Sequence, residues 1–172
     1  MMRRFRGESV HKVDAKGRVS VPAPFRRVLE EGDPDWTTGL NPNLVLIYGG
    51  PSGKCLEGYS IEAVAAIDAK ISRMPTFSKH RKALERWINT KSVYAQMDET
   101  GRIVLPQKLR DMMGIGGEAV FAGMGEKFQI WSPEEYDTDM TDLDAWGAEQ
   151  PEGETPFDAL DAMDLAATGG GS

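Results

Sequence analysis

The chain has 172 residues, 27 acidic and 20 basic, and a net charge of -7. Its hydrophobic fraction of 40% is ordinary for a soluble globular protein, and no stretch approaches the roughly 20 apolar residues of a membrane-spanning helix, which argues against a membrane protein. A single cysteine, Cys55, excludes an intrachain disulfide and indicates a reducing, cytoplasmic compartment.

The net charge averages two unlike regions. Residues 128–172 contain 12 Asp and Glu and no Lys or Arg, so residues 1–127 have 20 basic and 15 acidic side chains, a charge of +5. Residues 1–30 alone have eight basic and three acidic side chains. Concentrated positive charge favours a polyanion such as nucleic acid, although charge alone leaves an ordinary solvated surface as the alternative.

The first elements predict a hairpin followed by a helix. A strand is expected over residues 10–13, then a polar turn at 14–17, in which an Asp side chain accepts backbone N–H groups and a Gly supplies positive φ. Residues 18–21 alternate apolar and polar side chains, as in a half-buried strand. Pro22 ends this strand, and a short helix follows over 25–29.

The middle of the chain predicts a second hairpin and two helices. Residues 44–48 are continuously apolar, which indicates a strand buried on both faces. The glycine-rich residues 49–53 turn the chain into a strand over 54–59; they lack the first Gly and the final hydroxyl of a phosphate-binding loop. Helices over 61–71 and 78–88 carry apolar stripes that we predict to be core, with a subunit contact as the alternative.

The chain then repeats its beginning. Asp98-Glu-Thr-Gly-Arg102 matches Asp14-Ala-Lys-Gly-Arg18, and a Pro and a second Arg follow at the same spacing in both copies. Strands over 93–97 and 102–105, a helix over 108–112 and a hairpin over 119–131 complete the second copy. A tandem repeat of this length indicates two copies of one supersecondary unit that together close a core.

These two ordered motifs, with Phe5-Arg-Gly-Glu8 before the first, resemble the MraZ family of bacterial DNA-binding regulators. The resemblance implies an α+β, mainly β fold: an AbrB-like swapped-hairpin barrel built from two half-units in one chain. It also implies assembly into a ring-like homo-oligomer and control of transcription of the protein's own division and cell-wall gene cluster, in the cytoplasm at the nucleoid.

The expected organisation has four parts. Residues 5–59 form the first swapped-hairpin repeat, residues 60–90 a helical connection and residues 91–136 the second repeat. Residues 137–172 form an acidic tail whose composition predicts disorder, with a short helix at most. We favour solubility over competition with DNA as the role of this tail.

The residues of the first turn supply a mechanism for binding double-stranded DNA. A two-stranded ribbon fits the major groove, where Arg18 can donate two hydrogen bonds to guanine. Lys16 and Arg6 are the candidates for contact with phosphates or the groove, with Lys12 behind them. The alternative is that Asp14 pairs with Arg18, and Asp98 with Arg102, to brace the turns. We expect bracing in the second copy, with Asp14, Asp98 and Arg102 as supporting or secondary DNA contacts. Several tips on one ring would read direct repeats of a short guanine-containing box.

Other chemistry finds little support. His11, His80 and Cys55 lack the spacing of metal ligands or of a nucleophile with its base, so we expect no enzyme, no metal and no cofactor. An antitoxin with a partner-binding acidic tail is one alternative function, although antitoxin chains usually hold one half-unit. A protein-interaction scaffold is another, and it predicts binding that is insensitive to salt and to Arg18.

Overall fold

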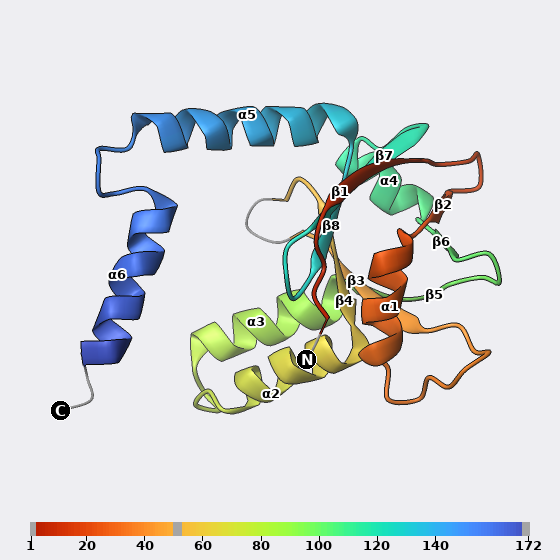
Figure 1. The fold of residues 1–172 in the computed structure, drawn as a ribbon. Helices are drawn as coiled ribbons and strands as arrows, with labels where there is room; N and C mark the ends of the chain where they lie inside the picture. Colours follow the sequence, from red (N-terminus) through yellow and green to blue (C-terminus); the bar gives the residue numbers. More distant parts are fainter. Residues whose placement is uncertain (1–2, 50–52, 170–172) are drawn as a thin grey trace. The chain divides into compact units, whose positions relative to one another are not determined.

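The structure, a computed structural model, describes residues 3–49 and 53–169 (Figure 1). The chain divides into two units, Met1–Pro133 and Glu134–Ser172. The elements in chain order are β1 (Glu8–Lys12), β2 (Arg18–Ser20), α1 (Ala23–Glu31), β3 (Asn43–Ile47), β4 (Leu56–Ser60), α2 (Ile61–Ser72), α3 (Lys79–Thr90), β5 (Ser92–Gln96), β6 (Arg102–Val104), α4 (Gln107–Met113), β7 (Glu118–Gly123), β8 (Phe128–Trp131), α5 (Pro133–Glu149) and α6 (Pro156–Gly169).

The two repeats exchange strands. The main sheet has the order β1-β7-β8-β4-β3-β5, and all its neighbours are antiparallel. β1 of the first repeat pairs with β7 of the second, and β5 of the second pairs with β3 of the first. The predicted hairpins are short: across the first turn the strands share a single antiparallel bridge between Val13 and Val19, and each turn is closed by one backbone hydrogen bond, from Asp14 N to Arg18 O and from Asp98 N to Arg102 O. β3 and β7 are buried along nearly their whole length, so each needs a ladder partner on both edges; its own repeat supplies one partner and the other repeat supplies the second.

The strands that follow the two turns form a separate ribbon. β2 pairs along its length with β6, and Val19 lies opposite Ile103, both buried; Val19 also forms an isolated antiparallel bridge with Val13. Across the described residues, β1 and β5 are the edges of the six-stranded sheet and do not pair with each other. The fold is therefore α+β with a mainly antiparallel sheet, as expected, but the sheet is not closed into a barrel.

One core serves both repeats. Four phenylalanine rings meet at its centre, two from the first repeat and two from the second: Phe5, Phe25, Phe121 and Phe128. Their centroids are 5.0–5.8 Å apart, the usual range for packed aromatic pairs. Because each repeat contributes half of this cluster, neither repeat buries its apolar face alone.

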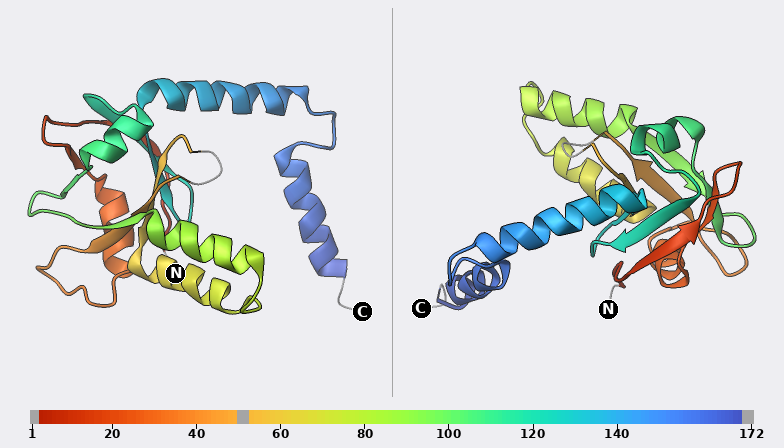
Figure 2. Two further views of the ribbon diagram at one scale, coloured as in Figure 1. Left: turned by 180° about the vertical axis from the view of Figure 1, so that it is seen from behind. Right: turned by 90° about the horizontal axis from the view of Figure 1, so that it is seen from above.

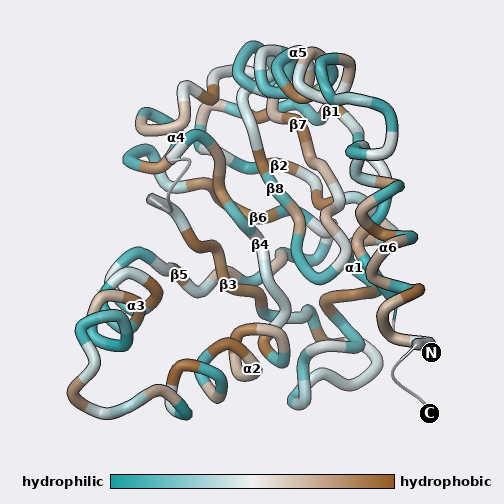
Figure 3. The backbone as a smooth tube through the Cα atoms, turned by 90° about the vertical axis from the view of Figure 1, so that its left-hand side faces the viewer, coloured by the Kyte–Doolittle hydropathy of each residue, from teal (hydrophilic) through white to brown (hydrophobic). Residues whose placement is uncertain are grey.

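The helical connection contributes little to the core. Ser60 is the N-cap of α2, and its Oγ accepts a hydrogen bond from Ala63 N. α2 carries many hydrophobic residues (Figure 3), but only Ile71 of this helix is buried, and α3 has no buried residue. The prediction that both apolar stripes are core is therefore wrong. α2 and α3 lie side by side (Figure 2) and share half-buried apolar residues.

The acidic segment contains two helices. α5 has 17 residues and α6 has 14, and neither has a buried residue. The structure differs here from the expected disorder with a short helix at most. Local signals account for the difference: Thr155 and Asp158 exchange hydrogen bonds in a capping box at the start of α6, and Ala, Leu and Met favour helix in its body. The 50–52 part of the predicted glycine-rich loop and the final residues 170–172 lie outside the described residues.

Candidate nucleic-acid interface

The first turn is held by the side chain of Asp14. Its Oδ1 accepts hydrogen bonds from the backbone N–H groups of Lys16 at 3.0 Å and Arg18 at 2.9 Å. Its Oδ2 accepts one from Arg18 Nε at 2.6 Å. These bonds, led by that from the Arg18 backbone N–H, lower the pKa of the Asp14 carboxyl. The carboxylate is therefore ionised at neutral pH and fixes the Arg18 guanidinium.

The second turn repeats this arrangement. Asp98 Oδ1 accepts from the backbone N–H groups of Thr100 and Arg102, both at 2.9 Å, and Oδ2 accepts from Arg102 Nε at 2.9 Å. The Thr100 hydroxyl donates a further bond at 2.8 Å. The pKa of Asp98 is lowered to about 2, chiefly by the Arg102 backbone N–H. Bracing therefore occurs in both copies, and the expectation that it distinguishes the second from the first is wrong.

Each turn also locks onto the other repeat. Gly17 has φ +86°, its carbonyl accepts from Leu105 N at 2.8 Å, and a Cβ there would lie 2.4 Å from the Leu105 carbonyl oxygen. Gly101 has φ +77°, and its carbonyl accepts from Val21 N at 3.0 Å. The second arginine of each repeat, Arg26 or Arg110, has a structural role at these turns. Arg110 lies against Gly17 and Arg26 against Gly101, so they are structural braces between the repeats.

The two turn arginines share one face of the β2–β6 ribbon. Arg18 lies opposite Val104, and Arg102 lies opposite Ser20. Arg18 and Arg102 are thus a diagonal pair, about 7–8 Å apart between Cα atoms. Their side chains are 38% and 36% exposed, whereas the residues between them on each strand are buried. Both turns also project from the same side of the unit (Figures 1 and 2).

This pairing was not predicted from the sequence. We gave Arg102 a supporting role because the second turn holds Glu99 and Thr100 where the first holds Ala15 and Lys16. The signal was present in the matched apolar positions of the repeats, since two short strands of like pattern can pair with each other as well as within a hairpin. Only the observed register shows that the two arginines become neighbours.

The other predicted contacts lie at different distances from the ribbon. Lys16 is exposed in the first turn, and Lys12 is exposed at the end of β1 that leads into it. Arg6 is exposed before the opposite end of β1, six residues from Lys12, which corresponds to about 20 Å along a strand. The structure therefore places Lys12, Lys16 and Arg18 along one short stretch of chain and separates Arg6 from them.

The residues considered for other chemistry do not come together on one element. His11 lies on β1, where burial lowers its pKa, and its Nε2 is 2.8 Å from Ser9 Oγ. Cys55 is buried before β4, and His80 lies on α3. Of the helices in the described ranges, none has the length and apolar character needed to cross a bilayer.

Comparison with known proteins identifies close relatives. The MraZ protein family, which is described as antitoxin-like, matches residues 4–87 and 90–153. The chain is 51% identical to the transcriptional regulator MraZ of Ruegeria pomeroyi. The alignment of 162 residues covers 94% of this chain and 97% of the relative. It is 50% identical over 162 residues to that of Ruegeria sp. TM1040, with the same coverage. Identity to the Cereibacter sphaeroides protein is 44% over 147 residues, 81% of this chain and 86% of the relative.

Proposed function

Because the chain belongs to the MraZ family, we propose that it is a sequence-specific DNA-binding transcriptional regulator that acts on its own division and cell-wall gene cluster. The observation that carries the proposal is the pair of partly exposed arginines on one face of the β2–β6 ribbon. The relatives are named transcriptional regulators, and this ribbon is the part of the chain whose chemistry suits a DNA groove.

The ion pairs prepare the arginines for base reading. Asp14 holds Arg18 through Nε, and Asp98 holds Arg102 in the same way. The terminal guanidinium nitrogens then donate to guanine O6 and N7, the commonest specific contact in the major groove. A side chain fixed in advance loses less conformational freedom on binding. Base reading is thus shared between both repeats, while Lys16 and Lys12 neutralise phosphates beside them.

One ribbon offers few contacts with DNA, so the function requires several ribbons that bind together. We place the two repeats in an AbrB-like swapped-hairpin arrangement, with copies of the chain assembled in a ring. Linked weak contacts raise the apparent affinity on the order of a hundredfold or more when their spacing matches the sites. The matching operator consists of direct repeats of a short guanine-containing box, about one helical turn apart.

The test is fluorescence anisotropy of the full chain on DNA from upstream of its gene and on scrambled DNA, across a salt series. Arg18→Ala and Arg102→Ala are each expected to weaken operator binding by about 5- to 150-fold, the loss of one bidentate base contact, and to narrow the preference over scrambled DNA. Wild-type binding should weaken steeply with salt.

Arg3→Ala is the matched control, because Arg3 also forms an exposed ion pair, with Glu31 at 2.9 Å, outside the ribbon. It is expected to bind the operator as the wild type does. If Arg18→Ala binds like Arg3→Ala, the Asp–Arg pairs are structural braces and the proposed readout is wrong. Binding to neither DNA would instead favour the protein-interaction scaffold.

A further inference from the structure

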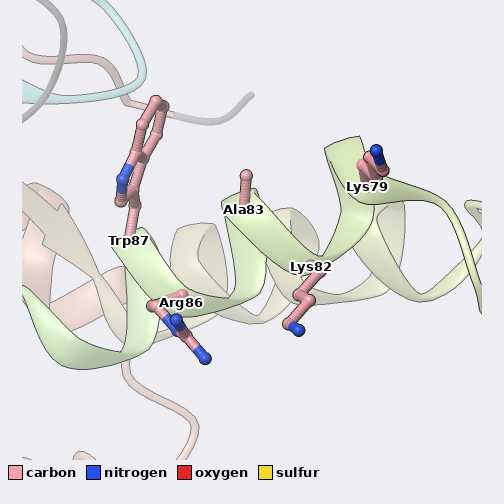
Figure 4. Close-up of a pocket in the computed structure, with 5 residues that line it drawn as sticks. All are labelled: Lys79, Lys82, Ala83, Arg86 and Trp87. Atoms are coloured by element: carbon pink, nitrogen blue, oxygen red, sulfur yellow. The ribbon is translucent and has the colours of Figure 1, made fainter.

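One face of α3 is exposed, basic and aromatic. Lys79, Lys82, Ala83, Arg86 and Trp87 recur at the spacing of a single helical face and line a shallow hollow (Figure 4). Trp87, 49% exposed, stands at one end of this face. The opposite side of α3, with Leu84 and Ile88, is half-buried. We call these five residues the basic α3 face.

The cations of this face are not neutralised within the unit. Of the ion pairs in residues 3–49 and 53–169, the one on α3 joins Arg81 to Glu85 at 2.8 Å, and none includes Lys79, Lys82 or Arg86. Three exposed cations around an exposed indole form a surface that suits a partner with both carboxylates and apolar side chains.

The chain contains a helix of that chemistry. α6 has three acidic residues and no basic one. Phe157, Leu160, Asp161, Asp164 and Leu165 recur at the same spacing as the five residues of the basic α3 face. The three apolar residues among them are 63–79% exposed, which is unusual for a helix of a soluble protein unless another surface covers it. We call these five residues the acidic α6 face.

We propose that the acidic α6 face docks on the basic α3 face of a second copy of the chain. The carboxylates of Asp161 and Asp164 pair with the cations of α3, and the apolar side chains cover Trp87 and Ala83. α6 lies beyond residues 4–87 and 90–153, which match the family, so this contact is a feature of chains that carry the additional helix. A single helix pair is smaller than a stable interface, so the contact is weak and a cross-linker is needed to detect it.

The test uses full-length chains with one new thiol each. A chain with Ala83→Cys is mixed with a chain with Leu160→Cys, and a short bismaleimide bridges thiols that lie close together; Cys55 is buried and common to all samples. We expect a covalent dimer containing one chain of each kind. Ala166→Cys, on the opposite side of α6, is the matched control and is expected to give about tenfold less product.

Charge reversal tests the recognition. We expect the yield of covalent dimer to fall about tenfold when the first chain carries Lys79→Glu, Lys82→Glu and Arg86→Glu together. The same fall is expected when the second chain carries Asp161→Lys and Asp164→Lys. Mixing the two reversed chains is expected to restore it, because the charges are again complementary; circular dichroism checks that each variant keeps its helices.

Three outcomes would overturn the proposal. The first is equal cross-linking from Leu160→Cys and Ala166→Cys. The second is a yield that does not respond to charge reversal. The third is the absence of a mixed covalent dimer when a single chain that carries both Ala83→Cys and Leu160→Cys does cross-link within itself, which would place α6 on its own α3. In the second case, reduced operator binding by the α3 variants would assign this face to DNA phosphates.

Discussion

Gly17→Ala tests the interlock between the two repeats. Alanine at φ +86° costs about 1–2 kcal/mol. Its Cβ would lie 2.4 Å from the Leu105 carbonyl oxygen, a backbone atom, so the strands must separate and strain the bond from Leu105 N to the Gly17 carbonyl. That bond contributes about 1 kcal/mol. We expect the free energy of unfolding to fall by about 2–3 kcal/mol, which for a chain of this size lowers Tm by roughly 5–10 °C.

Two other glycines supply matched controls for a urea unfolding series. Gly7 has φ +92° but no atom within 4 Å of an added Cβ, so Gly7→Ala measures the backbone cost alone. Gly116 has open space and an ordinary φ, so Gly116→Ala is expected to stabilise slightly, by about 0.4–1 kcal/mol. If Gly17→Ala costs no more than Gly7→Ala, the close approach of the repeats at this turn does not contribute to stability, and our account of the interlock is refuted.

Three further predictions concern the pH dependence and the local packing. The pKa of Asp98 is depressed to about 2 in the folded chain. The ionised side chain therefore contributes fully to the free energy of unfolding above the unfolded pKa of about 3.9, and this contribution is lost as the pH falls through about 2. Asp98→Asn should reduce the change in the urea unfolding midpoint between pH 4 and 2, and a pH profile equal to that of the wild type would contradict this. Gly58→Ala places a Cβ 2.2 Å from the buried Phe128 ring and is expected to cost about 1–3 kcal/mol, measured by thermal unfolding, with Phe128→Leu as a rescue whose failure would argue against the clash. Ser60→Ala removes the α2 cap to Ala63 N and should cost about 1 kcal/mol; no loss of helical circular dichroism or stability would show that α2 is held by other contacts.

Much of the local structure could be predicted from sequence. Asp-x-x-Gly turns, strand alternation and the proline stops are local signals, because a turn needs positive φ at its Gly and Pro cannot continue a ladder. The predicted helix over 25–29 corresponds to α1, and the predicted strand over 44–48 corresponds to the buried β3.

The partners of these elements could not be predicted in the same way. The alternation of residues 18–21 fits pairing with β1 or with β6 equally well, because both partners offer the same period of two. The choice depends on the central strands β3 and β7, which are buried on both faces and draw β1 and β5 away from the turns. The pairing of β2 with β6, and with it the placement of Arg18 beside Arg102, follows from that competition.

The duplicated unit, the braced turns and the contrast between basic residues 1–127 and acidic residues 128–172 can be recognised from the order of residues along the chain. The shared aromatic core, the common ribbon face of the turn arginines and the exposure of one side of α3 emerge from the folded chain. Each of these requires contacts between residues distant in sequence, whose choice among similar partners is made by burial and by the completion of backbone hydrogen bonds.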